Sequence, residues 1–318
     1  MTTQSAFVIE LPEGSLAIHD LTVGPVAPDA PVVLAVHGIT ANGLSWRRVA
    51  DEVARRHGPG AVRFLAPDLR GRGDSGTAPG PYGLAAHVDD LVQTASVFAA
   101  APVLVGHSMG AFISALAVAR HPDRFAGAVL VDGGLAFPVD ASVDIDATLQ
   151  AVIGPAMDRL RMRFGGPGEY LDFWKQHPAL GPVLDGPGGD AARAYIEHDL
   201  VEDPDAPGSW HSTCVLDAVR ADGADVLADP ETHAAVRTAA GRGVPLELVW
   251  AHRGLLDEPQ GLYDEQRLVA LDVPASVRTT SVDANHYDVI LGETGVSAVV
   301  DAVDRMLADP SAASRRAG

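Results

Sequence analysis

The sequence predicts an α/β fold: a mostly parallel sheet of about eight strands, with helices on both faces and an inserted helical cap. Three observations support this prediction. Strand-like and helix-like segments alternate over residues 32–134, no convincing strand occurs over 135–243, and the strand pattern returns after 243. Because such alternation is typical of parallel sheets, residues 1–134 and 244–318 are assigned to one core domain and 135–243 to the cap.

The first half of the core is predicted from short apolar runs bounded by turn residues. Two strand-like stretches, 6–11 and 16–23, flank Gly14 and suggest an antiparallel hairpin. Beyond them, runs long enough for a buried parallel strand alternate with segments whose apolar residues recur every three or four positions. The predicted strands are 32–36, 62–66, 103–105 and 128–131, and the predicted helices are 46–56, 87–98 and 111–120.

The predicted cap consists of helical segments broken by glycine and proline. Its helical candidates are 169–177, 191–200, 232–240 and a segment with Pro155 in its first turn. After the cap, strands are predicted at 246–250 and 276–282, followed by a closing helix at about 296–307.

Composition limits the class of protein. The net charge is −19, and such an excess of acidic groups repels nucleic acid and acidic membrane surfaces, so neither is expected as a partner. No apolar run is long enough to span a membrane, and residues 1–10 lack the pattern of a secretory signal. With a single cysteine, Cys214, no intrachain disulfide forms, and we expect a cytoplasmic protein.

The strongest chemical signal is the sequence Gly-His-Ser-Met-Gly at 106–110, which matches G-x-S-x-G between a predicted strand and a predicted helix. A sharp turn at this point pushes the hydroxyl of Ser108 out above the sheet, and glycine on either side lets strand and helix pass closely. We therefore expect Ser108 to be a nucleophile. The N–H group of Met109, at the start of the helix, points the same way and is expected to stabilise an oxyanion.

A serine nucleophile needs a general base, which is expected late in the chain. His286 follows the last predicted strand within a few residues, at the edge of the sheet where ligands bind in such folds. A second oxyanion donor is expected after the strand 32–36, where Gly38 permits a turn that aims the N–H group of Ile39 at the substrate. His37 is expected to hold this loop by hydrogen bonds rather than to react.

These segments together resemble the α/β-hydrolase superfamily. The resemblance rests on His37-Gly38, on Asp-Leu-Arg-Gly-Arg-Gly-Asp-Ser at 68–75, and on the serine turn. It implies a Ser–His–acid triad without a cofactor. Serine at the turn argues against the dehalogenase and epoxide hydrolase chemistry of relatives that use a carboxylate nucleophile. No zinc-binding Cys/His spacing and no phosphate-binding glycine loop occur, so no metal is expected either.

The acid of the triad has two candidates. The usual slot in the superfamily, after the strand 246–250, falls near Gly254, and Asp257 follows a few residues later. A second placement, which resembles that of some dehalogenases and lactone hydrolases, is the end of the preceding strand, where Asp132 stands. An Asp-Gly-Gly sequence is also a ready turn, so Asp132 has a structural alternative. We favour Asp132 and keep Asp257 as the alternative.

The predicted reaction is hydrolysis of a carboxylic ester or lactone through an acyl-enzyme on Ser108. A cap excludes water and shapes the pocket. The side chains expected to contact a hydrophobic small-molecule substrate are Leu135, Phe164, Trp174, Tyr195 and Trp210. Three rivals stay open: a thioesterase or acyltransferase, a carbon–carbon bond hydrolase, and a non-catalytic ligand receptor of the same fold. The oligomeric state is also open, with a homodimer as one alternative.

Overall fold

A computed structural model of the protein describes residues 5–11, 14–137 and 144–309. Eight strands form one mostly parallel sheet, as the sequence predicts, and their order is β1-β2-β4-β3-β5-β6-β9-β10. β2 runs antiparallel to both β1 and β4, and the other neighbours are parallel. The strands are β1 (Ser5–Leu11), β2 (Gly14–Asp20), β3 (Val32–Val36), β4 (Arg63–Pro67), β5 (Val103–His107), β6 (Gly127–Val131), β9 (Leu246–Ala251) and β10 (Arg278–Val282).

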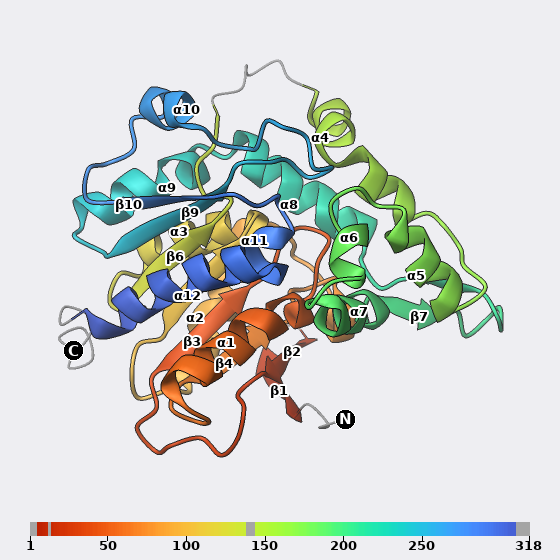
Figure 1. Ribbon diagram of the computed structural model, residues 1–318, viewed down its shortest axis with the longest axis horizontal. Coiled ribbons are helices and arrows are strands. Elements are labelled where there is room, and N and C mark those ends of the chain that lie inside the picture. Colours follow the sequence, from red (N-terminus) through yellow and green to blue (C-terminus); the bar gives the residue numbers. More distant parts are fainter. Residues whose placement is uncertain (1–4, 12–13, 138–143, 310–318) are drawn as a thin grey trace.

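Helices cover both faces of this sheet (Figure 1). The core helices are α1 (Arg47–His57), α2 (Leu84–Ser96), α3 (Met109–Arg120), α10 (Glu265–Ala270), α11 (Asp288–Leu291) and α12 (Glu293–Ala308), with short 3₁₀ turns η1 (Gly43–Trp46) and η2 (Gly73–Ser75). Along β3, Val33 and Ala35 lie in the buried cluster of α1 and α12. Leu34 and Val36 lie in the cluster of α2 and α3. Successive strand residues therefore bury opposite faces, which explains the uninterrupted apolar run in the sequence.

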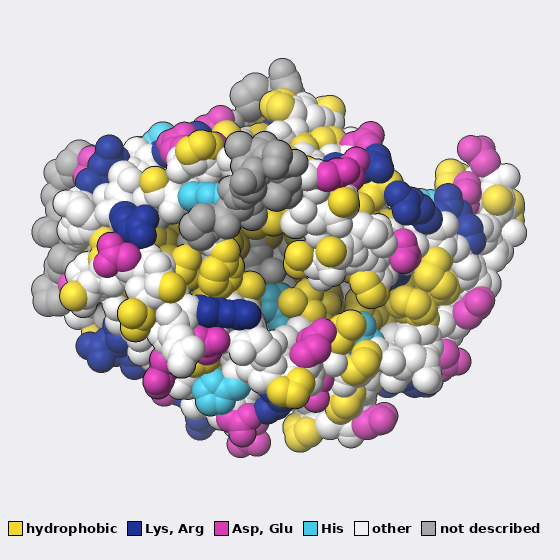
Figure 2. All heavy atoms as spheres, turned by 90° about the horizontal axis from the view of Figure 1, so that it is seen from above, with side chains coloured by type: hydrophobic (Ala, Val, Ile, Leu, Met, Phe, Trp, Pro, Cys, Tyr) yellow, Lys and Arg dark blue, Asp and Glu magenta, His cyan; other side chains and the backbone are white. Residues whose placement is uncertain are grey.

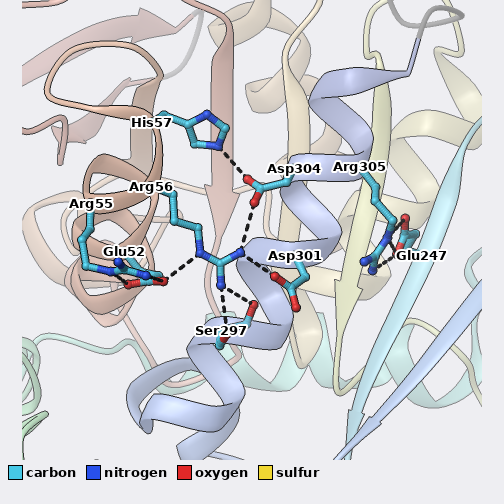
Figure 3. Close-up of polar contacts among 9 residues, drawn as sticks. All are labelled: Glu52, Arg55, Arg56, His57, Glu247, Ser297, Asp301, Asp304 and Arg305. Atoms are coloured by element: carbon cyan, nitrogen blue, oxygen red, sulfur yellow. Dashed lines mark hydrogen bonds and ion pairs between the residues drawn. The ribbon is translucent and has the colours of Figure 1, made fainter.

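An ion-pair network joins α1 to α12 on one face of the sheet (Figure 3). The guanidinium of Arg56 on α1 donates hydrogen bonds to Glu52 on its own helix and to Asp301 and Asp304 on α12. His57 also pairs with Asp304, at 2.7 Å. One arginine thus fixes the packing of two helices that are far apart in the sequence.

The segment between β6 and β9 contains α4 (Ile145–Arg159), α5 (Pro167–Lys175), α6 (Gly181–Leu184), α7 (Gly189–His198), α8 (Leu216–Ala228) and α9 (Pro230–Gly241). α4 packs against α8, whereas α9 packs against α3 of the core. α4 is kinked at Ile153, whose backbone is not helical, and Pro155 lies two residues after the kink. Residues 138–143 of the predicted cap and 310–318 of the predicted core lie outside the described part of the chain.

The prediction that residues 135–243 hold no strand is wrong. β7 (Leu200–Glu202) and β8 (Trp210–Ser212) form a two-stranded antiparallel sheet, and Phe164 pairs with Trp210 as an isolated bridge. Strands of three residues are too short to show alternation, so the sequence pattern did not reveal them. Within the described ranges, no helix combines the length and hydropathy of a membrane span.

Candidate active site

Ser108 lies at the turn between β5 and α3. β5 ends at His107 and α3 begins at Met109, so the turn is a single residue. The backbone angles of Ser108 are φ 55° and ψ −122°, a conformation that residues with side chains rarely adopt. Its N–H group donates to the carbonyl of Val131 on β6, at 2.9 Å, which ties the turn to the neighbouring strand.

The glycines around Ser108 are required by close backbone contacts. A Cβ atom on Gly106 would lie 2.1 Å from the carbonyl oxygen of Gly110. A Cβ atom on Gly110 would lie 2.1 Å from the carbonyl oxygen of Val36. Since neither distance is sterically allowed, only glycine lets β5, α3 and β3 approach so closely. The G-x-S-x-G spacing is therefore a consequence of packing.

His286 and Asp132 form a buried pair beside this turn. Nδ1 of His286 lies 2.6 Å from Oδ2 of Asp132, and the other carboxylate oxygen accepts the N–H group of Ala251, at 3.1 Å. Asp132 is fully buried directly after β6 and has φ 43°. With Nδ1 donating to the carboxylate, Nε2 of His286 carries the free lone pair that a general base needs.

Asp257, the alternative acid, lies elsewhere. Its side chain is 42% exposed and forms an ion pair with Arg253, at 2.8 Å. It also accepts a hydrogen bond from the Asn285 side chain, at 3.1 Å. The hydrogen bond to Arg253 lowers the pKa of Asp257 below its usual value. The structure thus brings Asp132, and not Asp257, to the imidazole of His286.

The loop after β3 holds the N–H group of Ile39 through its neighbours. His37 donates from Nδ1 to the carbonyl oxygen of Gly38, at 2.8 Å, and accepts the N–H group of Leu69 at Nε2, at 3.0 Å. Because the peptide between Gly38 and Ile39 is planar, fixing its carbonyl also fixes the opposing N–H group. Burial lowers the pKa of His37 to about 3, so the ring stays neutral and Nε2 remains an acceptor.

Arg72 holds the next peptide of this loop. Its Nε and Nη2 atoms donate to the carbonyl oxygen of Ile39, at 3.0 and 2.9 Å. Its Nη1 atom pairs with Asp222 on α8, at 2.6 Å, and the same carboxylate contacts His87 on α2, at 3.0 Å. Burial would raise the pKa of Asp222, but His87 and Arg72 hold it well below its usual range. A charged network, fully buried, therefore connects the loop to two helices.

Ser108 and His286 line the same small cavity. Its open interior measures about 50 Å³, room for a few water molecules. Every lining residue is uncharged or a histidine, and most are apolar: Gly38, Ile39, Thr40, Ala41, Ser45, His107, Ser108, Ile153, Ala156, Tyr195, Leu255, His286, Tyr287, Ile290 and Leu291. Seen from above, hydrophobic side chains gather in the middle of the molecular face, and charged side chains lie both beside this area and at the margin (Figure 2). The cavity thus suits a small, uncharged group.

The five side chains predicted to contact substrate have different places. Tyr195 lines the cavity. Phe164 and Trp174 belong to an aromatic cluster with Tyr170 and Phe173, and Trp210 packs against the same core. Leu135 packs among the residues of the opposite core cluster. Only Tyr195 of the five therefore lies in the cavity.

Sequence reasoning did not single out several lining residues. Tyr287, Ile290 and Leu291 follow His286 directly, and Leu255 lies in the loop after β9. The position of Tyr287 next to the predicted base was the one signal available. Leu255 carried none, because the path of a loop cannot be read from its composition.

The comparisons with known proteins agree with this architecture. The sequence model described as the alpha/beta hydrolase fold matches residues 31–290. The chain therefore belongs to the alpha/beta hydrolase fold family, which confirms the resemblance seen in the sequence.

Individual relatives match part of the chain. Lipase LipV of Mycobacterium tuberculosis is 36% identical over 121 residues, which are 37% of this chain and 44% of LipV. Epoxide hydrolase A of the same organism is 30% identical over 169 residues, 52% of this chain and 46% of that protein. The chain thus spans less than half the length of these relatives. The crystal structure of E-2-(acetamidomethylene)succinate hydrolase is similar over 95% of this chain and 99% of its own, with a TM-score of 0.69 and 19% identity.

Proposed function

We propose that the protein is a serine hydrolase that cleaves a carboxylic ester or lactone of a hydrophobic small molecule. The observation that carries the proposal is the hydrogen bond of 2.6 Å between His286 and Asp132, together with the shared cavity of His286 and Ser108. In the proposed reaction, Ser108 attacks the carbonyl carbon while Nε2 of His286 takes the hydroxyl proton. His286 then returns that proton to the leaving alkoxide, and water hydrolyses the acyl-enzyme by the same route.

Charge develops on the carbonyl oxygen as Ser108 adds to it. We assign the N–H groups of Ile39 and Met109 as the donors that stabilise this oxyanion. Both belong to backbone that is held in place: Ile39 by His37 and Arg72, and Met109 by its position at the first turn of α3. Such preorganised donors typically contribute a factor of about 10²–10³ each to the rate.

The cavity supports a restriction on the substrate. Its lining has no carboxylate, lysine or arginine to pair with a charged group, and its volume is small. We therefore propose a neutral substrate with a short acyl group. We also propose a cytoplasmic location, which the single cysteine supports.

The first test is hydrolysis of p-nitrophenyl esters of increasing acyl length and of a panel of small lactones. Wild type is compared with Ser108→Ala, Asp132→Asn and Asp257→Asn. We expect Ser108→Ala to lose nearly all activity, and Asp132→Asn to lose about 10⁴-fold in kcat because the histidine adopts the wrong tautomer. Asp257→Asn, the matched control, should stay near wild type.

The outcomes separate the alternatives. Loss in Asp257→Asn with activity kept in Asp132→Asn would move the acid to the loop after β9. Turnover of thioesters or acyl transfer to an amine in preference to water would replace the esterase by a thioesterase or acyltransferase. If folded wild type turns over no ester or lactone, the proposal fails, and diketone cleavage or tight binding without turnover becomes the next measurement.

A further inference from the structure

Four potential metal ligands converge at the end of β4, away from the Ser108 cavity. They are His19 on β2, Asp68 directly after β4, Asp74 in η2 and His198 at the end of α7. Nε2 of His19 and Nε2 of His198 lie 2.9 and 2.7 Å from the same oxygen of Asp68. One donor atom from each of the four residues lies within 4.8 Å of the others, and no second such group occurs within the described residues.

The carboxylate of Asp68 is oriented by the backbone around it. Oδ1 accepts the N–H group of Gly43, at 2.7 Å, and Oδ2 accepts that of Asp74, at 2.8 Å. Gly73 adopts φ 49°, and a Cβ atom there would lie 2.2 Å from Oδ2. The loop therefore wraps the carboxylate closely and fixes its direction. Metal-binding carboxylates are commonly held by hydrogen bonds of this kind.

The electrostatics of the cluster favour a cation. Two carboxylates face two imidazoles, so the group carries net negative charge whenever both imidazoles are neutral. His19 and Asp68 are buried and Asp74 is exposed, which leaves the group open to solvent on one side.

We propose that this cluster binds one Zn²⁺ ion through Nε2 of His19, Nε2 of His198 and one oxygen each of Asp68 and Asp74. Two imidazoles with two carboxylates are a donor set that Zn²⁺ accepts in tetrahedral geometry. Each imidazole now directs its Nε2 proton at Asp68. For Zn²⁺ to bind at Nε2, a neutral imidazole shifts this proton to Nδ1, whereas a protonated imidazole releases it to solvent and keeps its Nδ1 proton. Either route leaves a neutral ring whose Nε2 lone pair forms the Zn–N bond.

The bound ion would join parts of the chain that are distant in sequence. His19 and Asp68 belong to the sheet, whereas His198 closes α7, which also carries Tyr195 in the Ser108 cavity. Arg72, which holds Ile39, lies in the loop between Asp68 and Asp74. We therefore expect zinc to brace α7 and this loop against the sheet, with a larger effect on stability than on the chemical step.

The test is isothermal titration of untagged protein with ZnCl₂, followed by thermal unfolding with and without the metal. We expect one ion per chain and a rise in Tm. His198→Gln and Asp74→Asn should each weaken zinc binding by at least about tenfold and reduce that rise. His57→Gln is the matched control, because His57 forms an imidazole–carboxylate contact of the same length, 2.7 Å, with a single acid, Asp304.

Three results would overturn the proposal: no stoichiometric binding by wild type, binding unchanged in both cluster variants, or equal weakening by His57→Gln. If His198→Gln does not fold, Asp74→Asn decides alone, because the Asp74 side chain is exposed. Both measurements record binding and stability rather than turnover. Their failure is therefore distinguishable from failure of the proposed hydrolase activity.

Discussion

Gly133 packs directly against the backbone of Ser108, with no room for a side chain between them. A Cβ atom on this residue would lie 2.2 Å from the carbonyl oxygen of Ser108 and 2.9 Å from its Cα atom. Its neighbour Asp132 already has a positive φ. The chain therefore has no freedom to move Gly133 without moving the two residues proposed as nucleophile and acid.

We predict that Gly133→Ala lowers kcat/KM for ester hydrolysis by about 10²-fold or more, because displacement of reacting groups by about 1 Å has that cost. The measurement is steady-state hydrolysis with circular dichroism to confirm folding. Gly168→Ala is the control, since it lies on α5 with no atom within 4 Å of the added Cβ. Alanine should leave α5 intact and stabilise it by less than about 1 kcal/mol, the difference found in helix interiors, because Gly168 lies in the first turn. Equal activity of the two variants would contradict the steric argument.

Single residues differ in how far the sequence predicts them. The motif around Ser108 and the chain order predicted the neighbourhood of Ser108 and His286, because both follow from strand ends. The sequence left two candidates for the triad acid, Asp132 and Asp257, because the path of the loop after β9 determines which of them can reach His286. Residues 19, 68, 74 and 198 have no motif spacing, and only the fold brings them together.

Helices α1 and α12 depend on the network around Arg56. Its side chain is 20% exposed and contacts three acids, whereas Arg55 is 70% exposed and contacts Glu52 alone. Networks of partly buried charges contribute more than isolated surface pairs. The position of the two helices is thus fixed partly by charge and partly by the apolar cluster beneath them.

We predict that Arg56→Met lowers the free energy of unfolding by about 1 kcal/mol at low salt, and by less at 1 M NaCl, where exposed charges are screened. Urea denaturation at the two salt concentrations measures this. Arg55→Met should leave the urea midpoint unchanged. A salt-independent loss in Arg56→Met would show that packing, rather than charge, carries the contribution.

Helices and strands were predicted from the sequence where apolar residues form a run or recur at a regular spacing. The inner strands β3, β4, β5, β6 and β9 were predicted from mostly apolar runs, because nearly all of their residues are buried. β10 is mostly exposed and was predicted from its β-branched residues. α8 went unrecognised because two of its buried positions hold Asp222 and Gly223. A buried ion pair and a close contact with Leu149 replace the apolar side chains that would have signalled a helix.

One buried and one partly buried histidine, His37 and His177, make the stability of the protein sensitive to mild acid. Burial lowers the pKa of His37 to about 3 and that of His177 to about 4, against 6.5 in the unfolded chain. Below pH 6.5 the unfolded chain therefore binds protons that the folded protein does not, and stability falls with pH. The contribution of His198 to stability has the opposite pH dependence. Because its pKa is raised in the folded protein, this contribution is complete below pH 6.5 and is lost at higher pH.

We predict that the free energy of unfolding falls between pH 6.5 and pH 5, by about 2 kcal/mol from His37 alone. Denaturation at constant ionic strength measures the change. The comparison stops at pH 5, because burial raises the pKa of Asp51, Asp225 and Asp288, which act in the opposite direction as they titrate. His177→Gln should reduce the slope of stability against pH, and a flat profile in wild type would contradict the lowered pKa values of His37 and His177.

The proposed acid on β6 has a consequence for how this chain can diversify. Because the proposed acid follows β6, the loop after β9 carries none of the proposed reacting residues, and its Leu255 lines the cavity. Gly254 and Asp257 of this loop contact His286 and Asn285, but a side chain such as Leu255 can be exchanged without replacing Ser108, Asp132 or His286. New substrate preferences can then arise by exchanging a side chain of this loop, with the hydrolytic chemistry inherited intact.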